Sequence, residues 1–443
     1  EKLNPANPHQ VANPAGGWRD MTVGMESVPV RGRKAPYDYE KQYTAHGTVI
    51  ALDRERHLAY TLRWSGAEPG TAAELGALAI GRASSWEEFR RALDRWKMPV
   101  AEFVYADVTG HVASATAGLV PVRASGRGGL PVAGWTADAD WRGFQSADRL
   151  PSSLDPRSAA IVSAPGNPAR QQRAMELLAA APVPPDDPLT IDQVRTVLRD
   201  THAWNAAQLI PLLAAITAGD PLVESARRRL IAWDRNVSVD SPDALLYVIW
   251  EHALLRRLGS LRIPSSLLDE FVGKAGRVLV PAIQVPTALW FDGDPLKARD
   301  ALLLDSLTAA IDDERRWTSA DASAVWGQYQ VLEFRHPLAI NDRARRRYAR
   351  GPFAVPGYHS TVFATLRATG ERTLGPMLEV MFDLKDWDRS RAIVAPGQAA
   401  APDSPHHADL AALWVRGEAP ALRFSDVGIN DVAETRLTLI PKP

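Results

Sequence analysis

One acidic residue in a hairpin-like stretch is the first candidate for chemistry. Residues 100 to 123 read VAEFVYADVTGHVASATAGLVPVR, which predicts two strands joined by an Asp-Val-Thr-Gly turn, with Glu102 at the start of the first strand. A carboxylate can move protons, but it can also repel negative charge that develops during a reaction. What Glu102 faces therefore decides whether it assists chemistry or prevents it.

Histidines provide two further candidates. His46, in TAHGTVI, precedes a glycine that begins a strand, and this position favours a turn histidine bonded to the backbone over a general base. His406 and His407 lie in PDSPHHADL, where flanking aspartates could suggest a metal site. Adjacent loop residues point in different directions, however, and no third spaced ligand follows. A surface loop or a helix start capped by Ser404 is the favoured interpretation, and no metal site is predicted.

Several classes of function are excluded or disfavoured by missing motifs. The sequence has no phosphate-binding loop, no Rossmann glycine pattern and no Gly-x-Ser-x-Gly elbow, so it predicts neither nucleotide chemistry nor a serine hydrolase complete within this chain. With 51 basic and 52 acidic residues the formal net charge is -1, which disfavours nucleic acid as a partner. Cysteine is absent, and no run of about 18 apolar residues predicts a membrane span.

The elements that position these residues change in kind along the chain. Residues 17 to 161 alternate like short strands, with a helix over SSWEEFRRALDRW that begins at the cap Ser85 and turns a core stripe inward, formed by Trp86, Phe89, Leu93 and Trp96. Residues 171 to 317 repeat apolar positions at three and four, which predicts helices. The Arg227 to Arg229 run is expected to be a solvated helix end. Strands return from Ala322 onward.

This order predicts an α+β protein in which one sandwich-like domain carries a helical insertion. The expected parts are residues 1–170 as the first part of the sandwich, 171–318 as the insertion, and 319–443 as the return strands and C-terminal segment. The opening EKLNPANPHQ has neither the basic start nor the apolar run of a signal peptide, and it leads us to expect a fragment or a processed subunit.

The order of segments resembles the large subunit of the penicillin amidase family, acylases with an N-terminal serine nucleophile. Ten similar segments follow one another over about nine tenths of the chain, among them TAHGTVI, FVYADVTGHVASATAGLVPVR, PVAGWTADADWRGF, VWGQYQVLEFRHPL, PFAVPGYHSTV and APGQAAAPDSPHHADLAALWVRGE. The resemblance implies a four-layer αββα sandwich. It also implies hydrolysis of the amide bond of an acylated amine to a carboxylic acid, with the serine's own α-amine as base.

The resemblance assigns the nucleophile to the first residue of the large subunit, freed by autoproteolysis, whereas residue 1 here is Glu. It therefore implies that no nucleophile lies on this chain and that a companion chain carries the N-terminal serine, together with a small subunit. No cofactor is expected. Calcium, which the family can bind, would have most of its ligands outside this chain. Family members are typically exported, which implies a periplasmic or extracellular location.

The resemblance also implies roles for four residues. The strand corresponding to EFVYAD starts in the family with an asparagine whose amide donates to the oxyanion, and this position falls on Glu102, which cannot donate when ionised. Loss of one such donor costs on the order of 100- to 1,000-fold in rate. Arg123 matches a supporting arginine and could pair with Glu102. Phe103 and His46 are weaker candidates for contact with an apolar acyl group.

Other departures from the family pattern lie at inner turns. Pro165 and Gly166 stand where relatives carry an Asn-Asn pair, Tyr358 replaces an aspartate, Phe363 an asparagine, and Glu379 ends a segment that is usually Ser-x-Arg, while GQSG survives only as GQAA. Three functions stay open on this basis. They are an amide acylase completed by a partner chain, an acyltransferase or condensing enzyme acting on a natural-product amine, and a non-catalytic scaffold.

Overall fold

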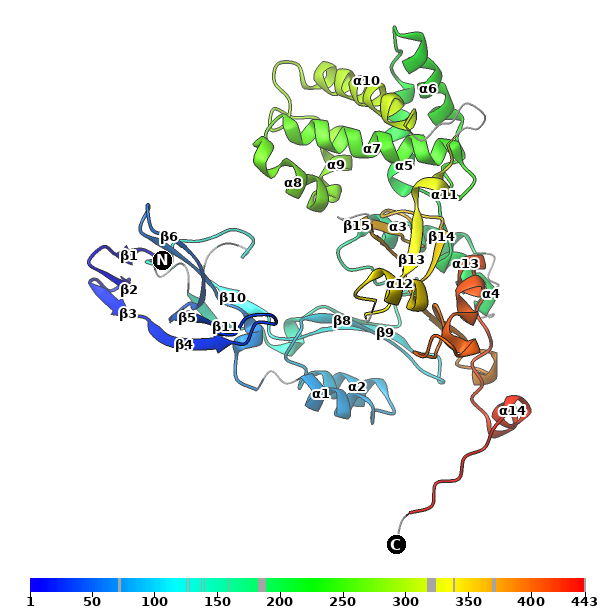
Figure 1. Cartoon of the computed structure of the whole chain (residues 1–443), viewed down its shortest axis with the longest axis horizontal. Helices are drawn as coiled ribbons and strands as arrows, with labels where there is room; N and C mark the ends of the chain where they lie inside the picture. The colour runs from blue at the N-terminus through cyan, green and yellow to red at the C-terminus, as the bar shows by residue number, and fades with distance from the viewer. Residues whose placement is uncertain are drawn as a thin grey trace. The chain divides into compact units, whose positions relative to one another are not determined.

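The chain folds into two compact units, residues Glu1–Ser163 and Ala164–Pro443, which are described separately (Figure 1). The computed structural model describes residues 1 to 441 apart from 71–72, 125, 127, 137, 139, 159, 182–188, 317–323, 338 and 369–371. Helices and strands are mixed throughout, which confirms the predicted α+β class. The expected boundary at 318 lies outside the described residues, and the three-part division stays a prediction.

Antiparallel sheets dominate the first unit. One sheet has the order β1-β2-β3 and a second the order β4-β5-β6-β7. The bounds of these strands are β1 Leu3–Asn4, β2 Asn7–Ala12, β3 Trp18–Asp20, β4 Thr22–Val28, β5 Tyr37–Thr44, β6 Gly47–Asp53 and β7 Leu58–Leu62. A small core of Leu3, Val11, Met21 and Ala59 joins the two sheets.

The hairpin that carries Glu102 belongs to a third sheet of this unit, with the order β12-β9-β8. Its strands are β8 Ala101–Ala106, β9 Val112–Ala117 and β12 Ser152–Leu154; β10 Pro121–Arg123 and β11 Trp141–Phe144 form a separate pair. Helix α2 (Trp86–Leu93) follows α1 (Ala73–Ile80) and packs on one face of this sheet. The Ser85 hydroxyl accepts from the Glu88 amide, as expected of the predicted cap.

The aromatic stripe of α2 is core, as its spacing predicts. Phe89 lies 5.1 Å from Tyr105 and 6.3 Å from Phe103 between ring centroids, and Trp96 lies 5.0 Å from Phe103. Leu93 is buried beneath them with Ala115 and Ala117 of β9. This packing fixes which face of β8 looks inward, and thereby fixes the opposite face on which Glu102 lies.

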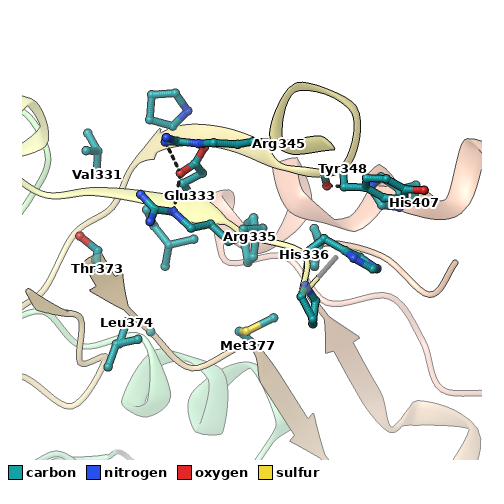
Figure 2. Close-up of a pocket in the computed structure, with 16 residues that line it drawn as sticks. Val331, Glu333, Arg335, His336, Arg345, Tyr348, Thr373, Leu374, Met377 and His407 are labelled. Atoms are coloured by element: carbon teal, nitrogen blue, oxygen red, sulfur yellow. Dashed lines mark hydrogen bonds and ion pairs between the residues drawn. The ribbon is translucent and has the colours of Figure 1, made fainter. Parts of the chain in front are cut away.

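Short strand pairs of the second unit surround its smaller core. They are β13 Val331–Phe334 with β14 Arg350–Ala354, β15 Leu366–Ala368 with β16 Arg372–Leu374, and β17 Leu378–Met381 with β18 Arg391–Val394. Helices α12 (Asp342–Tyr348), α13 (Asp409–Arg416) and α14 (Asp426–Val432) lie in the same stretch. Residues of β13, β16 and α12 line a cavity (Figure 2).

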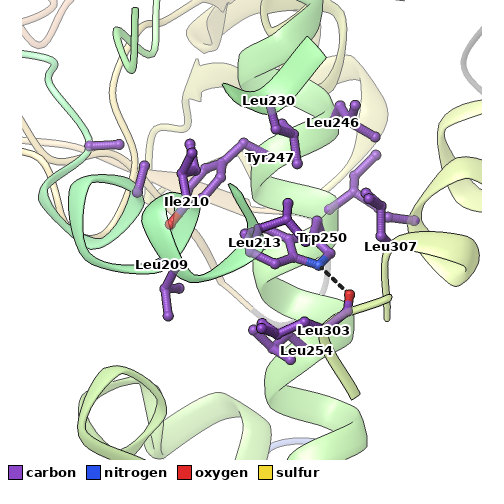
Figure 3. Packing of buried hydrophobic residues seen from close by; sticks show 14 of the residues in the cluster. Leu209, Ile210, Leu213, Leu230, Leu246, Tyr247, Trp250, Leu254, Leu303 and Leu307 are labelled. Carbon is purple, nitrogen blue, oxygen red and sulfur yellow. Dashed lines mark hydrogen bonds between the residues drawn. The ribbon is translucent and has the colours of Figure 1, made fainter. Parts of the chain in front are cut away.

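The larger core of the second unit is helical. Its helices are α3 Pro168–Ala180, α4 Ile191–Leu198, α5 Trp204–Ala214, α6 Pro221–Ala232, α7 Pro242–Ser260, α8 Leu268–Lys274, α9 Gly276–Gln284, α10 Pro295–Glu314 and α11 Trp326–Tyr329. Leu209, Leu213, Leu230 and Leu303 belong to this core together with Trp250, whose indole N–H donates to the Leu303 carbonyl at 3.2 Å (Figure 3). Asp220, Ser241 and Asp294 cap three of these helices, each before a proline that suits the first helical position.

One expectation for this block is wrong. Arg227 was expected on a solvated face, yet it is 8% exposed. Its Nε donates to Glu224 at 2.7 Å and its Nη1 to the Leu213 carbonyl at 3.2 Å. The end of α5 leaves carbonyl oxygens without helical donors, and the Arg227 guanidinium satisfies one of them.

Candidate functional site

One face of strand β8 packs against helix α2, and the opposite face carries the candidate site. Its side chains alternate, so Phe103 and Tyr105 face α2 while Glu102 and Val104 face the other way. Glu102 is exposed, and Val104 is 51% exposed. Across the pairing register, Thr116 lies opposite Glu102 and Ser114 opposite Val104. This face of the sheet therefore presents a carboxylate beside two hydroxyl side chains.

Glu102 is held by a serine far away in the sequence. The Ser163 hydroxyl donates to Glu102 Oε2 at 2.6 Å. Within the described part of the chain, this is the one hydrogen bond that the Glu102 carboxylate forms, and no cationic side chain forms an ion pair with it. A short bond to a carboxylate is of the charge-assisted kind, which is stronger than one between neutral groups. Glu102 is thus an acceptor here and not a donor.

Arg123 is not brought to Glu102. It ends β10, opposite Trp141 of β11, and its guanidinium lies 5.7 Å from the centre of the Trp141 ring. Arg63 lies over the same ring at 4.6 Å. Attraction between guanidinium groups and an indole face positions both arginines. The ion pair considered between Glu102 and Arg123 is therefore not formed.

Phe103 does not share the face of Glu102. Its ring packs between Phe89 and Trp96 of the α2 region, edge to face with both. Such a contact contributes to the cohesion of the sheet and helix. The structure thus places Phe103 in packing, one residue from the candidate site but on the opposite side of the strand.

His46 lies at the β5 to β6 turn and is buried between two carboxylates. Its Nδ1 is 2.6 Å from Glu1 Oε1 and its Nε2 is 3.1 Å from Asp140 Oδ1. Since carboxylates accept hydrogen bonds, both ring nitrogens donate when the ring is protonated. The bond to Glu1, assisted by that to Asp140 and opposed by burial, raises the pKa of His46. These contacts connect the β5 to β6 turn to Glu1 and Asp140 within the first unit.

The paired histidines near the C-terminus point apart, as expected. His406 Nδ1 lies 2.9 Å from Asp409, while His407 is buried with its two ring nitrogens near the Ala399 and Tyr348 carbonyls. Ser404 accepts from the His406 amide, in agreement with the predicted cap. Over the residues that the structure describes, no three His, Cys, Asp or Glu side chains gather as a metal site.

Sequence reasoning missed Ser163. It follows AAIV in a stretch with no motif of its own, and 61 positions separate it from Glu102. Ser163 lies in an irregular segment between β12 and α3, so no strand periodicity predicts where its side chain points. The contact between Ser163 and Glu102 is long-range, and no local pattern in the sequence indicates it.

Three of the departures at inner turns, Tyr358, Phe363 and Glu379, are buried. Tyr358 is 2% exposed and contacts the Tyr247 ring at 6.1 Å, and Phe363 is 2% exposed and packs on Trp414. Glu379 accepts from Arg199 Nε at 2.9 Å and lies 2.6 Å from its Nη2. These positions belong to cores and a buried ion pair of the second unit.

Comparison with known proteins establishes the family. A family model described as penicillin amidase matches residues 1–431. The chain is 28% identical over 458 residues to penicillin acylase 2 proenzyme of Pseudomonas sp. strain SE83, covering 96% of this chain and 56% of that protein. It is 24% identical over 497 residues to acyl-homoserine lactone acylase QuiP of Pseudomonas aeruginosa, covering 96% and 58% respectively. The chain belongs to the penicillin amidase family.

The fold is confirmed by a solved structure. Thermostable penicillin G acylase from Alcaligenes faecalis aligns with a TM-score of 0.71 at 18% identity, covering 100% of this chain and 85% of that one. The chain has the N-terminal-nucleophile hydrolase fold that the resemblance implied. It spans just over half the length of the curated relatives it matches. Among the described helices, none has the length and apolar character that crossing a bilayer requires.

Proposed function

We propose that this chain is the large-subunit portion of an amide acylase, which hydrolyses an N-acyl amine to a free carboxylic acid and an amine. The observation that carries the proposal is the match of the family model over residues 1–431, together with relatives named as penicillin and acyl-homoserine lactone acylases. The substrate class is therefore a small acylated amine, with neither nucleic acid nor membrane as a partner.

The proposed nucleophile is an N-terminal serine on a companion chain that also brings the small subunit. Its oxygen attacks the amide carbon while its α-amine takes the hydroxyl proton, directly or through a water. The amine leaves with that proton, and water then cleaves the acyl ester to release acid and regenerate the serine. The relative named as a proenzyme supports processing of a precursor into such chains. Export to the periplasm or the cell exterior is proposed on family grounds alone.

Glu102 sets the main condition on this mechanism. It lies on the open face of β8 and accepts from Ser163, and a carboxylate that only accepts offers no donor to a developing oxyanion. For Glu102 to contribute, it must take up a proton when substrate and companion chain exclude water, and then donate through its hydroxyl. Otherwise the other hydrogen-bond donors to the oxyanion must stabilise it without Glu102.

The same observation favours a second candidate, a non-catalytic relative kept as a binding or scaffold subunit. A carboxylate beside an oxyanion raises the barrier that the family's asparagine lowers. Arg123 does not neutralise it, since that side chain lies against Trp141. The two candidates make opposite predictions for an acylated serine on the assembled protein.

The test is to purify the natural assembly, record the intact mass of each chain, and treat it with a serine-directed acylating probe. We expect one companion chain to begin with serine and to gain a single acyl group saturably. A panel of N-acyl amines should then release free acid. Absence of both the label and the acid would overturn the acylase and leave the scaffold. Product that forms only when an acceptor amine is added would instead identify an acyltransferase.

A further inference from the structure

A cavity in the second unit takes no part in any step proposed above. It has a volume of about 570 Å³ and is lined by residues of β13, α12 and β16, by the loops after β13 and β16, and by Pro352, Pro396 and His407 (Figure 2). Pockets for small molecules usually measure about 300 to 1,000 Å³. The cavity is thus large enough for a small organic molecule.

Most of its lining is apolar. Leu332 and Phe334 of β13 contribute buried side chains to the lining. Leu374 and Met377 also line the cavity, and their side chains are 54% and 47% exposed to solvent. Three prolines, at positions 337, 352 and 396, complete this part of the lining. Apolar side chains that stay exposed inside a concave surface are typical of binding sites.

A cluster of two arginines and one carboxylate supplies the polar part. Arg345 donates to Glu333 through Nε at 2.9 Å and Nη2 at 2.7 Å, and Arg335 Nε donates to the same carboxylate at 2.7 Å (Figure 2). Two guanidinium groups share one carboxylate, so the cluster carries net positive charge. Arg345 holds the pKa of Glu333 below its usual value, with Arg335 assisting, which keeps that carboxylate ionised.

The surrounding sequence strengthens this charge. Residues 335 to 350 contain six arginines and one acidic residue, Asp342, in a chain whose formal net charge is -1. Five of these arginines lie on or beside α12, of which Arg345 lines the cavity and Arg346 does not. An anion that approaches this side of the unit therefore meets a local positive field.

We propose that this cavity binds a carboxylic acid with an apolar body, of the size of a medium-chain fatty acid. The apolar body fills the space beside Leu374 and Met377, and the carboxylate meets the guanidinium groups of Arg335 and Arg345. Guanidinium groups suit this role because their planar arrangement of donors matches a carboxylate. Glu333 then acts as an internal competitor that limits affinity.

The experiment is isothermal titration calorimetry of the full chain with decanoate and, in parallel, with its uncharged analogue decanamide. We expect saturable one-site binding of decanoate and much weaker binding of decanamide. Arg345→Gln should weaken decanoate at least tenfold. The matched control is Arg346→Gln, which removes the same charge from the next residue but outside the lining, and it should change affinity less than twofold.

A gain of affinity gives the sharper test, because misfolding cannot produce it. Glu333→Gln removes the competing carboxylate and should tighten decanoate binding several-fold. Three results would overturn the proposal: no saturable binding, equal weakening by Arg345→Gln and Arg346→Gln, or equal affinity for decanoate and decanamide. Binding to the chain that disappears in the natural assembly would also overturn it, since the cavity would then be a contact for a companion polypeptide.

Discussion

Ser163 donates a hydrogen bond of 2.6 Å to Glu102 across 61 positions of sequence. The bond ties the end of the first unit to the first strand of its hairpin, and it occupies one oxygen of the carboxylate that the resemblance places at an oxyanion-donor position. Ser163 therefore fixes the orientation of a charge that the proposed reaction must either neutralise or tolerate.

Replacement of that charge is the most direct test of the site. Glu102→Asn in the natural assembly restores an amide donor, and we expect kcat/KM for an N-acyl amine to rise about 100-fold, at the lower end of the effect of one oxyanion donor. Val104→Asn, two residues along the same face, is the control and should give no gain. A Glu102→Asn variant slower than the parent would show that the acid itself assists the reaction.

His46 should make stability depend on pH. Its pKa is raised in the folded state, chiefly by Glu1, so protonation stabilises the fold. This contribution is complete below the unfolded pKa of about 6.5 and is lost as pH rises through the higher folded value. Urea unfolding between pH 5 and 9 should show the loss, and His46→Gln should remove it. Exposed His57→Gln is the control; the same pH dependence in both variants would contradict the assignment.

The ion pair between Arg199 and Glu379 should be expensive to break. Both side chains are largely buried, at 14% and 9% exposed, so Glu379→Leu leaves an unpaired guanidinium and should cost about 3 to 5 kcal/mol of unfolding free energy. Removing Arg199 as well should recover most of the loss. The exposed pair of Arg416 and Glu418 is the comparison, and breaking it should lower the unfolding free energy far less, because solvent screens exposed charges. Equal losses of unfolding free energy for the two pairs would show that burial does not determine the cost of breaking an ion pair.

Asp388 should hold α14 in place by its charge. It accepts from the Phe424 and Ser425 amides at 2.8 and 2.9 Å and from the Ser425 hydroxyl at 2.5 Å, and the Ser425 bonds lead in lowering its pKa to about 2. A lowered pKa means that the contact persists above the unfolded value near 3.9 and weakens as pH falls toward 2. Asp388→Ala should speed hydrogen exchange in α14 at neutral pH. Asp431→Ala, within the exposed helix itself, should not change the exchange rate. Equal effects of the two substitutions would contradict the role of Asp388.

Local patterns allowed much of the fold to be predicted. The helix from Trp86 to Leu93, its cap Ser85 and its aromatic core all follow from spacing, because period 3.6 and the capping preference act within a few residues. The hairpin and its turn follow in the same way from period two. These elements depend on no distant partner.

Long-range partners could not be predicted. The turn position of His46 is visible in the sequence, but its two carboxylates lie 45 and 94 positions away. Arg227 reads as a surface charge until α5 brings carbonyl oxygens to it. For Glu102 the alternating face could be inferred, whereas Ser163 depends on the path of the chain over 61 residues.

The alternation along β8 also places different constraints on substitutions at the two faces of the strand. Tyr105 packs against Phe89 and Phe103 against Trp96, whereas Glu102 and Val104 lie on the exposed face, where Glu102 contacts Ser163. Substitutions on the second side therefore disturb less of the packed core. A lineage can in this way exchange a hydrogen-bond donor for an acid and explore a different reaction while the scaffold stays intact, and a library confined to positions 102, 104, 114 and 116 would explore the same space.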